Sequence, residues 1–528
     1  MQPLVPYEVV VPTEVLDDVW SSLSDGLRCL EESTLETTSR VLDTFDWRLW
    51  SAGLRLDVAR DGDGWHALLL SSAGDLVQRQ DLDRPLLGFA ESIPDGALRE
   101  RLVDRIEPRR LLPWVEMRLR TTRMRVVDAE EKTVVRIERI EPAASAIAFG
   151  TEALGEPLVL SPRLRLRPVR GYDDAFAAVR RHVGDLRLTP PTHLLIDEAL
   201  HAAGHAPGEY QGKPKLEFKA SEPAAEATRR IHRQLLDVLR VNEDGTRRDL
   251  DSEFLHDLRV SVRRTRSALT QIKGVFPPDH LEHFKNEMRW LGGVTGPTRD
   301  LDVYLLKMPA YRASLPDAIA DDLEPLQRFL VAHQKSEQKK LARTLRSARY
   351  RKLLADWQRF LDEPPDVSSA MAPNAERPIR EIASQRIWKS YRRVVKRGGR
   401  IDDSSPDDAL HDLRKDCKKL RYLLEFFAAL YPRGEIKAAV KALKRLQDVL
   451  GDFNDYSVQQ ESLRDFAEQM TSEETAAEHE APVDTLLAMG HLLAHLADGQ
   501  AAERRRFAER FRGFVAAENQ DRFRRLFG

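Results

Sequence analysis

Residues 255–303 recur as residues 410–458 at a constant offset of 155, without a gap. The motif LHDLR opens both copies, and glycine, proline, aspartate and leucine positions further along also match. At Arg263-Arg264 the second copy has Lys418-Lys419, so positive charge is kept where identity is not. A gapless match over this length indicates internal duplication, which predicts two similar helical bundles that face each other about a pseudo-two-fold axis.

The region that contains the repeat reads as all-helical. From about residue 221 the apolar residues follow the helical period, and residues 363–378 read as a loop that divides two halves of about 221–362 and 376–528. Residues 1–203 instead alternate in short strand-like segments, with helical patterns at 13–31 and 171–186. The Gly- and Pro-rich residues 204–220 read as a linker. The chain is therefore predicted to be multidomain, with an α+β domain followed by an all-α domain.

Composition narrows the class of protein. The chain is 42% hydrophobic and 32% charged, which favours a protein with a folded core. Only two cysteines occur, no apolar run approaches a membrane span, and the first residues do not resemble a signal peptide. We therefore expect a cytoplasmic protein without a membrane partner. Residues 211–528 carry 57 Lys and Arg against 50 Asp and Glu, whereas residues 1–210 carry 26 against 35, so the second half is the better candidate for an anionic partner.

Each copy of the repeat carries a basic stripe beside an apolar one. At about 100° per residue, His256, Arg259, Arg263 and Arg266 fall within a sector of about 80°, and the acids lie off this sector. The second copy repeats the stripe with His411, Arg414, Lys418 and Arg421. One such helix is most simply a solvated face, but two matching copies favour stripes that line a shared cleft. Arginine and lysine there suit a long anion with charge at every unit.

Three further features of the repeat have plausible structural roles. A lone helical histidine is more often a structural hydrogen-bonding residue than a ligand contact, so binding is a weak expectation for His256 and His411. Cys417 lies on the apolar stripe and is expected in the core. The matching GPTRD (296–300) and GDFND (451–455) segments look like turns whose Asp300 and Asp455 cap a helix or hold a stripe arginine.

The signatures LHDLRVSVRRTRSAL with GPTRDLDVYLL, and LHDLRKDCKKLRYLLEFF with LGDFNDYSV, resemble the two halves of a CHAD domain (conserved histidine α-helical domain) over roughly 221–528. The resemblance implies two four-helix bundles around a basic channel that binds inorganic polyphosphate. An association with polyphosphate granules is a further expectation. The channel residues it implies are His256, Arg259, Arg263, Arg264, Arg266, His411, Arg414, Lys418, Lys419 and Arg421. More peripheral candidates are Lys285, Arg289, Arg392, Arg393, Lys396, Lys437, Lys441, Lys444 and Arg445.

Residues 1–203 are similar to a CYTH domain, a tunnel-shaped antiparallel barrel associated with triphosphate hydrolysis. The similarity lies in residues 42–70 and 164–179. Where that family has Glu-x-Glu-x-Lys, this chain has Glu8, Val10 and Pro12, and Arg165 and Arg167 stand where acids are expected. Remaining candidates are Arg118, Arg120, Arg123 and Arg125 on one strand with Glu138 on the next. We therefore predict a degenerate domain with no catalytic residue, no metal site and no cofactor.

Two alternatives to polyphosphate binding stay open. The first is a metal-dependent triphosphatase that uses Mg²⁺ or Mn²⁺ in the CYTH-like tunnel. The second is nucleic-acid binding, which is disfavoured because the stripes carry neither interleaved aromatic residues for base stacking nor Asn or Gln for base edges.

Overall fold

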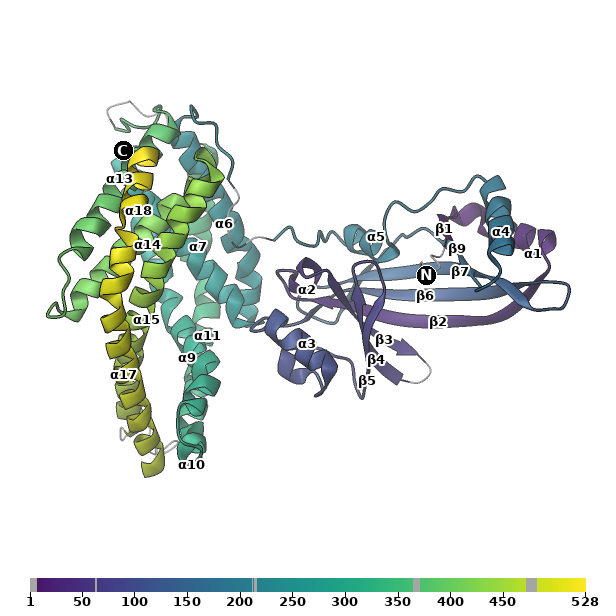
Figure 1. Ribbon diagram of the computed structural model, residues 1–528, viewed down its shortest axis with the longest axis horizontal. Helices are drawn as coiled ribbons and strands as arrows, with labels where there is room; N and C mark the ends of the chain where they lie inside the picture. Colours follow the sequence, from purple (N-terminus) through teal and green to yellow (C-terminus); the bar gives the residue numbers. More distant parts are fainter. Residues whose placement is uncertain (1–6, 62–63, 211, 213–215, 364–370, 472–481) are drawn as a thin grey trace. The chain divides into compact units, whose positions relative to one another are not determined.

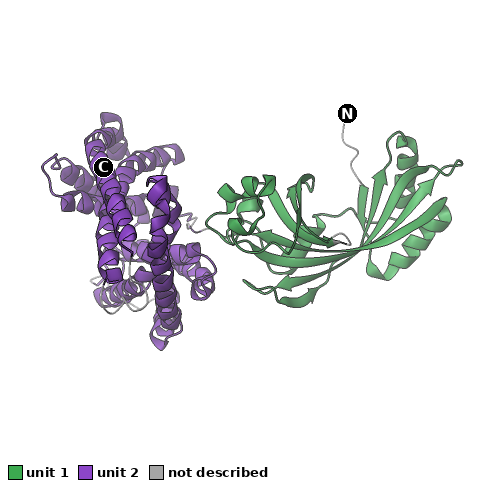
Figure 2. Ribbon diagram, turned by 90° about the horizontal axis from the view of Figure 1, so that it is seen from below, with its two compact units in different colours: residues 1–211 green, residues 212–528 purple. Residues whose placement is uncertain are grey.

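The computed structural model describes residues 7–61, 64–210, 212, 216–363, 371–471 and 482–528, and divides into two compact units at 211/212 (Figure 2). This division lies inside the segment 204–220 that the sequence marks as a linker, part of which falls outside the described residues. Residues 364–370 of the dividing loop predicted at 363–378 also fall outside them.

The first unit is built on one antiparallel sheet whose strands pair in the order β1-β9-β7-β6-β2-β3-β4-β5, with β8 paired to β7. The sheet is strongly curved (Figure 2). Its strands are β1 (Tyr7–Val10), β2 (Cys29–Asp43), β3 (Leu54–Asp61), β4 (Gly64–Ser71), β5 (Leu76–Leu82), β6 (Leu112–Val127), β7 (Thr133–Ile147), β8 (Leu154–Leu158) and β9 (Arg163–Pro168). The α+β class predicted from the alternating segments and the antiparallel strand pairing implied by the CYTH resemblance are therefore confirmed.

Helices cover one face of this sheet at its two ends. At one end α1 (Leu16–Gly26) and α4 (Asp173–Asp185) pack on Met124 and Val126 of β6. At the other end α2 (Arg48–Ser51) and α3 (Ala97–Ile106) pack on β3 and β4. The remaining helix of the unit is α5 (Leu195–Ala202). The helix predicted over 13–31 was too long, because α1 ends at Gly26 and the chain then enters the long strand β2, whose exposed Glu, Ser and Thr residues give no helical stripe.

The second unit is helical, as predicted (Figure 1). Its helices in the first repeat are α6 (Ala224–Arg248), α7 (Ser252–Gln271), α8 (Pro278–Val294), α9 (Gly296–Ala313), α10 (Asp317–Ala320), α11 (Glu324–Leu345) and α12 (Ala348–Asp362). Those of the second are α13 (Ile379–Gly398), α14 (Asp407–Phe426), α15 (Arg433–Thr471), α17 (Val483–Phe514) and α18 (Ala517–Phe527).

The offset of 155 extends beyond the motif to whole helices. Helices α6 and α13 begin at equivalent residues, and α7 and α14 both begin and end at equivalent residues. The long helix α15 corresponds to α8 and α9 joined, because the break that Thr295 and Gly296 make in the first repeat is absent at Leu450-Gly451. Residues 451–455 therefore lie within α15, and residues 296–300 are the first residues of α9, so the turns predicted at both segments are wrong.

A pair of backbone hydrogen bonds shows the pseudo-two-fold relationship directly. The N–H of Ala224 donates to the carbonyl of Arg377 (2.9 Å), and the N–H of Ile379 donates to the carbonyl of Glu222 (2.8 Å). Adding 155 to the first donor and subtracting it from the first acceptor gives the second bond. Each half therefore makes the same contact with the other, as a two-fold axis requires.

Both hydrophobic clusters of the second unit draw on both repeats. The larger one joins α6, α7, α8 and α12 to α13, α14, the first half of α15 and α18. The smaller one joins α9 and α11 to the second half of α15 and the first half of α17, which run alongside one another in Figure 1. Cys417 is fully buried in the larger cluster, as predicted. The two halves thus fold as one body, which fixes the position of α7 against α14.

Candidate anion-binding site

The two signature helices α7 and α14 pack against each other and are joined by an ion pair. Arg264 Nη2 on α7 donates to Glu425 Oε2 on α14 at 2.8 Å, and Arg421 Nε donates to the other oxygen of the same carboxylate at 2.8 Å. Arg264 is only 5% exposed. Its charge is therefore neutralised inside the protein, and Arg264 links the repeats.

Beside this contact, three cations from the two repeats lie close together. Arg263 of α7 is exposed, whereas Arg414 and Lys418 of α14 are half-buried. Burial, followed by the nearby charges of Arg414 and Arg263, lowers the pKa of Lys418 to about 8, although Asp455 acts in the opposite direction. Arg263 also lowers the pKa of Arg414, whose burial acts in the same direction. Among the described residues, neither Arg263 nor Lys418 forms an ion pair with a carboxylate. A group of positive charges held together in this way favours a bound anion.

Carboxylates support the arginines at the start of each stripe. Arg414 Nη2 donates to Asp455 Oδ1 at 3.1 Å, as predicted for that aspartate. In the first repeat Arg259 Nη1 donates to the carbonyl of Gly292 and to Thr295 Oγ1, both at 3.2 Å, and Asp300 is near enough to raise its pKa against the dominant lowering by burial. Both arginines are thus held at the base of the stripe by α8, α9 or α15.

The two signature histidines each contact an equivalent position. His256 Nδ1 lies 3.1 Å from Nη2 of Arg299, and His411 Nδ1 lies against Oδ1 of Asn454, the residue 155 positions later. Because a guanidinium only donates, Nδ1 of His256 accepts, and its proton is on Nε2. These contacts give both histidines a structural role that ties α7 to α9 and α14 to α15.

The second repeat neutralises some of its predicted binding residues. Asp416, which is 2% exposed, lies 3.2 Å from Lys419 and 3.9 Å from Arg393, and its closest partner is Arg397 at 2.8 Å. The equivalent residue in the first repeat is Ser261, whose hydroxyl donates to the carbonyl of Leu235. Lys419 and Arg393 therefore contribute less free positive charge than their sequence positions indicate.

A pocket of about 470 Å³ gathers other predicted residues. Lys437, Lys441 and Lys444 of α15 line it together with Arg264 and Glu425. On the first repeat the equivalent of Lys444 is Arg289, and its charge lowers the pKa of Arg266 after burial does so. The other predicted cations are Lys285, Arg392, Lys396 and Arg445. Among the described residues, none of them forms a hydrogen bond or ion pair with the pocket or the stripes, and Lys285 pairs instead with Glu282 at 3.3 Å.

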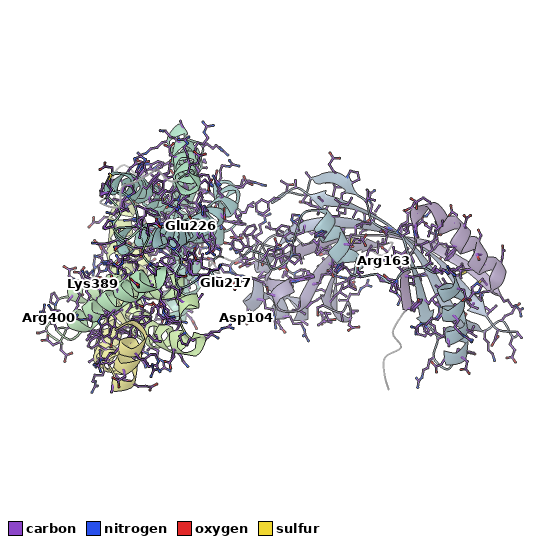
Figure 3. The ribbon with its side chains drawn as sticks, turned by 90° about the horizontal axis from the view of Figure 1, so that it is seen from above. Asp104, Arg163, Glu217, Glu226, Lys389 and Arg400 are labelled. Atoms are coloured by element: carbon purple, nitrogen blue, oxygen red, sulfur yellow. The ribbon has the colours of Figure 1, made fainter. Side chains whose placement is uncertain are left out.

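On the first unit, neighbouring strands place the candidate carboxylates opposite arginines. Glu8 pairs in register with Arg165, Arg165 with Glu138, and Glu138 with Arg123. Glu8 is bonded to Arg165 at 2.7 Å and to Arg163 at 2.9 Å, and Glu138 lies 2.9 Å from Arg167. Arg163 is labelled in Figure 3. Both carboxylates are therefore engaged by arginines.

The remaining arginines of β6 divide between the two faces of the sheet. Side chains alternate along a strand, so Arg118 and Arg120 lie on the face opposite Arg123 and Arg125. Only the second pair shares a face with Glu138. In the part of the chain that the structure describes, no group of three or more His, Cys, Asp or Glu side chains is arranged to hold a metal ion.

Residues 230–464 match the family model of the CHAD domain. The second unit contains a CHAD domain. An uncharacterized protein of Mycobacterium tuberculosis is 27% identical over 287 residues, which is 51% of this chain and 52% of the relative, so the match spans about half the length of that relative. The CHAD domain from the plant Ricinus communis is 28% identical, with a TM-score of 0.47 over 56% of this chain and 94% of the plant domain.

A putative adenylate cyclase of Bacillus halodurans is similar to 37% of this chain over 95% of its own length, at 14% identity and a TM-score of 0.25. Because this TM-score is low, we describe the fold of the first unit from its own strand order. Among the described residues, no helix combines the length and the apolar character needed to cross a membrane.

Sequence reasoning missed several residues that shape the CHAD site. Arg299 and Asn454 occupy equivalent positions, but they differ in identity and charge, so the repeat comparison gave no signal there. Glu425 and Thr295 have no counterpart of the same chemistry in the other half either. The signal that was available is their location, since each residue directly precedes a matched aspartate, Asp300 or Asp455.

Proposed function

We propose that the CHAD domain binds inorganic polyphosphate along the surface formed by α7 and α14, without chemical change to the chain of phosphates. The observation that carries this proposal is the group of Arg263, Arg414 and Lys418, in which two repeats bring cations together and leave two of them without a carboxylate partner. A polyphosphate supplies the missing negative charge at every unit and requires no particular backbone geometry.

The pseudo-two-fold relationship supports a long ligand rather than a small one. Apart from 264/419, whose side chains are paired with acids, four cation positions of the predicted site recur in both repeats, at 259/414, 263/418, 266/421 and 289/444. A ligand that crosses from one helix to the other therefore meets similar charges on both sides of the axis. Affinity is then expected to rise with chain length, because further phosphates reach further cations.

The experiment is a titration of the full chain with end-labelled polyphosphates of several lengths at several salt concentrations. We expect binding that tightens with length and weakens steeply with salt, because each neutralised phosphate releases counterions. Competition with single-stranded RNA is part of the same experiment. RNA that displaces polyphosphate at equal phosphate concentration would favour a general nucleic-acid site instead.

We also propose that the protein acts in the cytoplasm, on polyphosphate granules. The CHAD domain's cations are the support for this assignment. A fluorescent fusion should coincide with stained granules in cells, and a diffuse signal in granule-containing cells would contradict the assignment.

A further inference from the structure

The pocket beside Arg264 has a chemistry that inorganic polyphosphate does not use. One side of it is apolar and consists of residues from the end of α14, the 3-10 turn at Ala428–Leu430 and the start of α15. These residues are Leu424, Phe426, Ala428, Ile436 and Val440. A chain of phosphates alone gains nothing from an apolar wall, since every unit of it is charged and hydrated.

The same pocket also has a basic lining. Lys437, Lys441 and Lys444 stand four and three residues apart on α15, so they share one helix face and extend over about 10 Å of its axis. Among the described residues none of the three forms an ion pair with an acid. They can therefore contact several phosphate groups in succession.

The carboxylate of Glu425 also lines the pocket. Glu425 receives one hydrogen bond from Arg264 and one from Arg421, each at 2.8 Å, which leaves acceptor capacity on both oxygens. An acid at this place repels phosphate but accepts hydrogen bonds from an amino group. The pocket therefore combines an apolar surface that can contact a ring, a carboxylate that can accept a hydrogen bond from an amine, and a row of lysines that can bind phosphates.

This combination belongs to the second repeat alone. The positions equivalent to Lys437 and Lys441 in the first repeat are Glu282 and Asn286, and the position equivalent to Glu425 is Thr270. On the apolar side, Phe426 corresponds to Gln271 and Val440 to Lys285. The residues that line the pocket are therefore not explained by the duplication that produced the anion surface.

We propose that this pocket binds a nucleoside triphosphate, with the base against the apolar wall and the phosphates along the three lysines. The volume of about 470 Å³ lies within the usual range of sites for small organic molecules. An adenine amine can donate to Glu425, which prefers it over a base that presents only acceptors. The site then distinguishes an organic triphosphate from an inorganic one of similar charge.

The test is calorimetric titration of the full chain, with EDTA present, using ATP, inorganic tripolyphosphate and adenosine. ATP should bind at least about tenfold more tightly than tripolyphosphate, a difference of about 1.4 kcal/mol. Equal affinities for ATP and tripolyphosphate would overturn the proposal, because the apolar wall and Glu425 would then have no role.

Two phenylalanine substitutions in the same turn provide a matched pair. Ala428→Phe fills the pocket and should reduce ATP affinity at least about tenfold while tripolyphosphate affinity stays the same. Ala429→Phe, at an exposed neighbour outside the lining, should change neither. Thermal melting of both variants shows whether they fold. If folded Ala428→Phe binds ATP as the unsubstituted chain does, the assignment is wrong.

Binding of long polyphosphate to the same preparation separates this inference from the proposed function. Polyphosphate binding without ATP preference rejects the pocket assignment alone. ATP binding without polyphosphate binding rejects the proposed function alone.

Discussion

Arg264 on the first signature helix and Glu425 on the second form an ion pair of 2.8 Å across the pseudo-two-fold axis. Because Arg264 is almost fully buried, this contact has little competition from solvent. It joins the two repeats next to the cations that we assign to polyphosphate. The stability of the unit and the geometry of its anion surface therefore depend on the same pair.

Replacing Glu425 by Gln should destabilise the second unit by about 3 kcal/mol, because removal of one partner leaves the buried Arg264 charge uncompensated. Urea unfolding of the full chain, followed by circular dichroism at the helical signal, measures this change. Asp412→Asn is the control, since Asp412 is exposed and its ion pairs with Lys415 and Arg397 are worth little. A loss at Glu425 no larger than at Asp412 would mean that the ion pair does not hold the repeats together.

Affinity for polyphosphate should fall as pH rises through about 8. Burial and neighbouring cations lower the pKa of Lys418 to about 8 in the free protein, whereas a bound anion favours the charged amine and raises that pKa. Between the two pKa values binding takes up a proton, so the dissociation constant increases with pH. Titrations from about pH 7 to 9.5 test this prediction.

The control for the pH dependence is Lys418→Arg, which keeps the charge but does not titrate in this range. Its affinity should be nearly independent of pH over the same interval. The same pH dependence in both proteins would assign the titration to another group.

Replacing His232 by Leu should stabilise the second unit by about 1–2 kcal/mol. His232 is fully buried against Trp357 and Phe276, burial lowers its pKa to about 3, and neither ring nitrogen has a hydrogen-bond partner in the described structure. The equivalent residue in the second repeat is the buried Ile387. His491→Leu, at an exposed position, should change the free energy of unfolding by less than about 0.5 kcal/mol. A destabilised His232→Leu would show that the imidazole is bonded.

The protein should release no phosphate from inorganic triphosphate with Mg²⁺ or Mn²⁺. Hydrolysis in the first unit would require clustered carboxylates that are available to a metal, but Glu8 and Glu138 are each bonded to arginines. Phosphate release over time measures the activity. Metal-dependent turnover that Glu8→Gln abolishes would show that this carboxylate is catalytic after all.

The offset between the repeats predicted more of the fold than any local pattern. It predicted equivalent helices, observed as α7 and α14, and it indicated that Asp455 caps a helix or holds a stripe arginine, which the structure shows to be Arg414. It could not show that α15 runs through the position where Thr295 and Gly296 interrupt the first repeat. Whether the helix continues depends on the few residues at the junction and on the packing of α17 against α15. The matched positions of the repeat give no information about either.

Charge could be predicted, but its neutralisation could not. Lys418 and Lys419 are adjacent and identical in sequence, yet Lys419 lies 3.2 Å from Asp416 while Lys418 has no acidic partner within the described residues. The difference arises because the two side chains point to different sides of α14, one toward α7 and one toward α13. Only the packing of the repeats shows which cations remain for a ligand.

Binding of labelled polyphosphate to the double variant Arg263→Glu/Lys418→Glu tests the central claim most directly. Lys339→Glu/Arg505→Glu is the control, because it changes the net charge equally at two exposed residues outside the predicted site. At matched salt and with unchanged circular dichroism, we predict at least about a 100-fold loss, equivalent to about 2.7 kcal/mol, in the first variant and less than about threefold in the control. Equal affinities of the two variants would show that polyphosphate does not bind at Arg263 and Lys418.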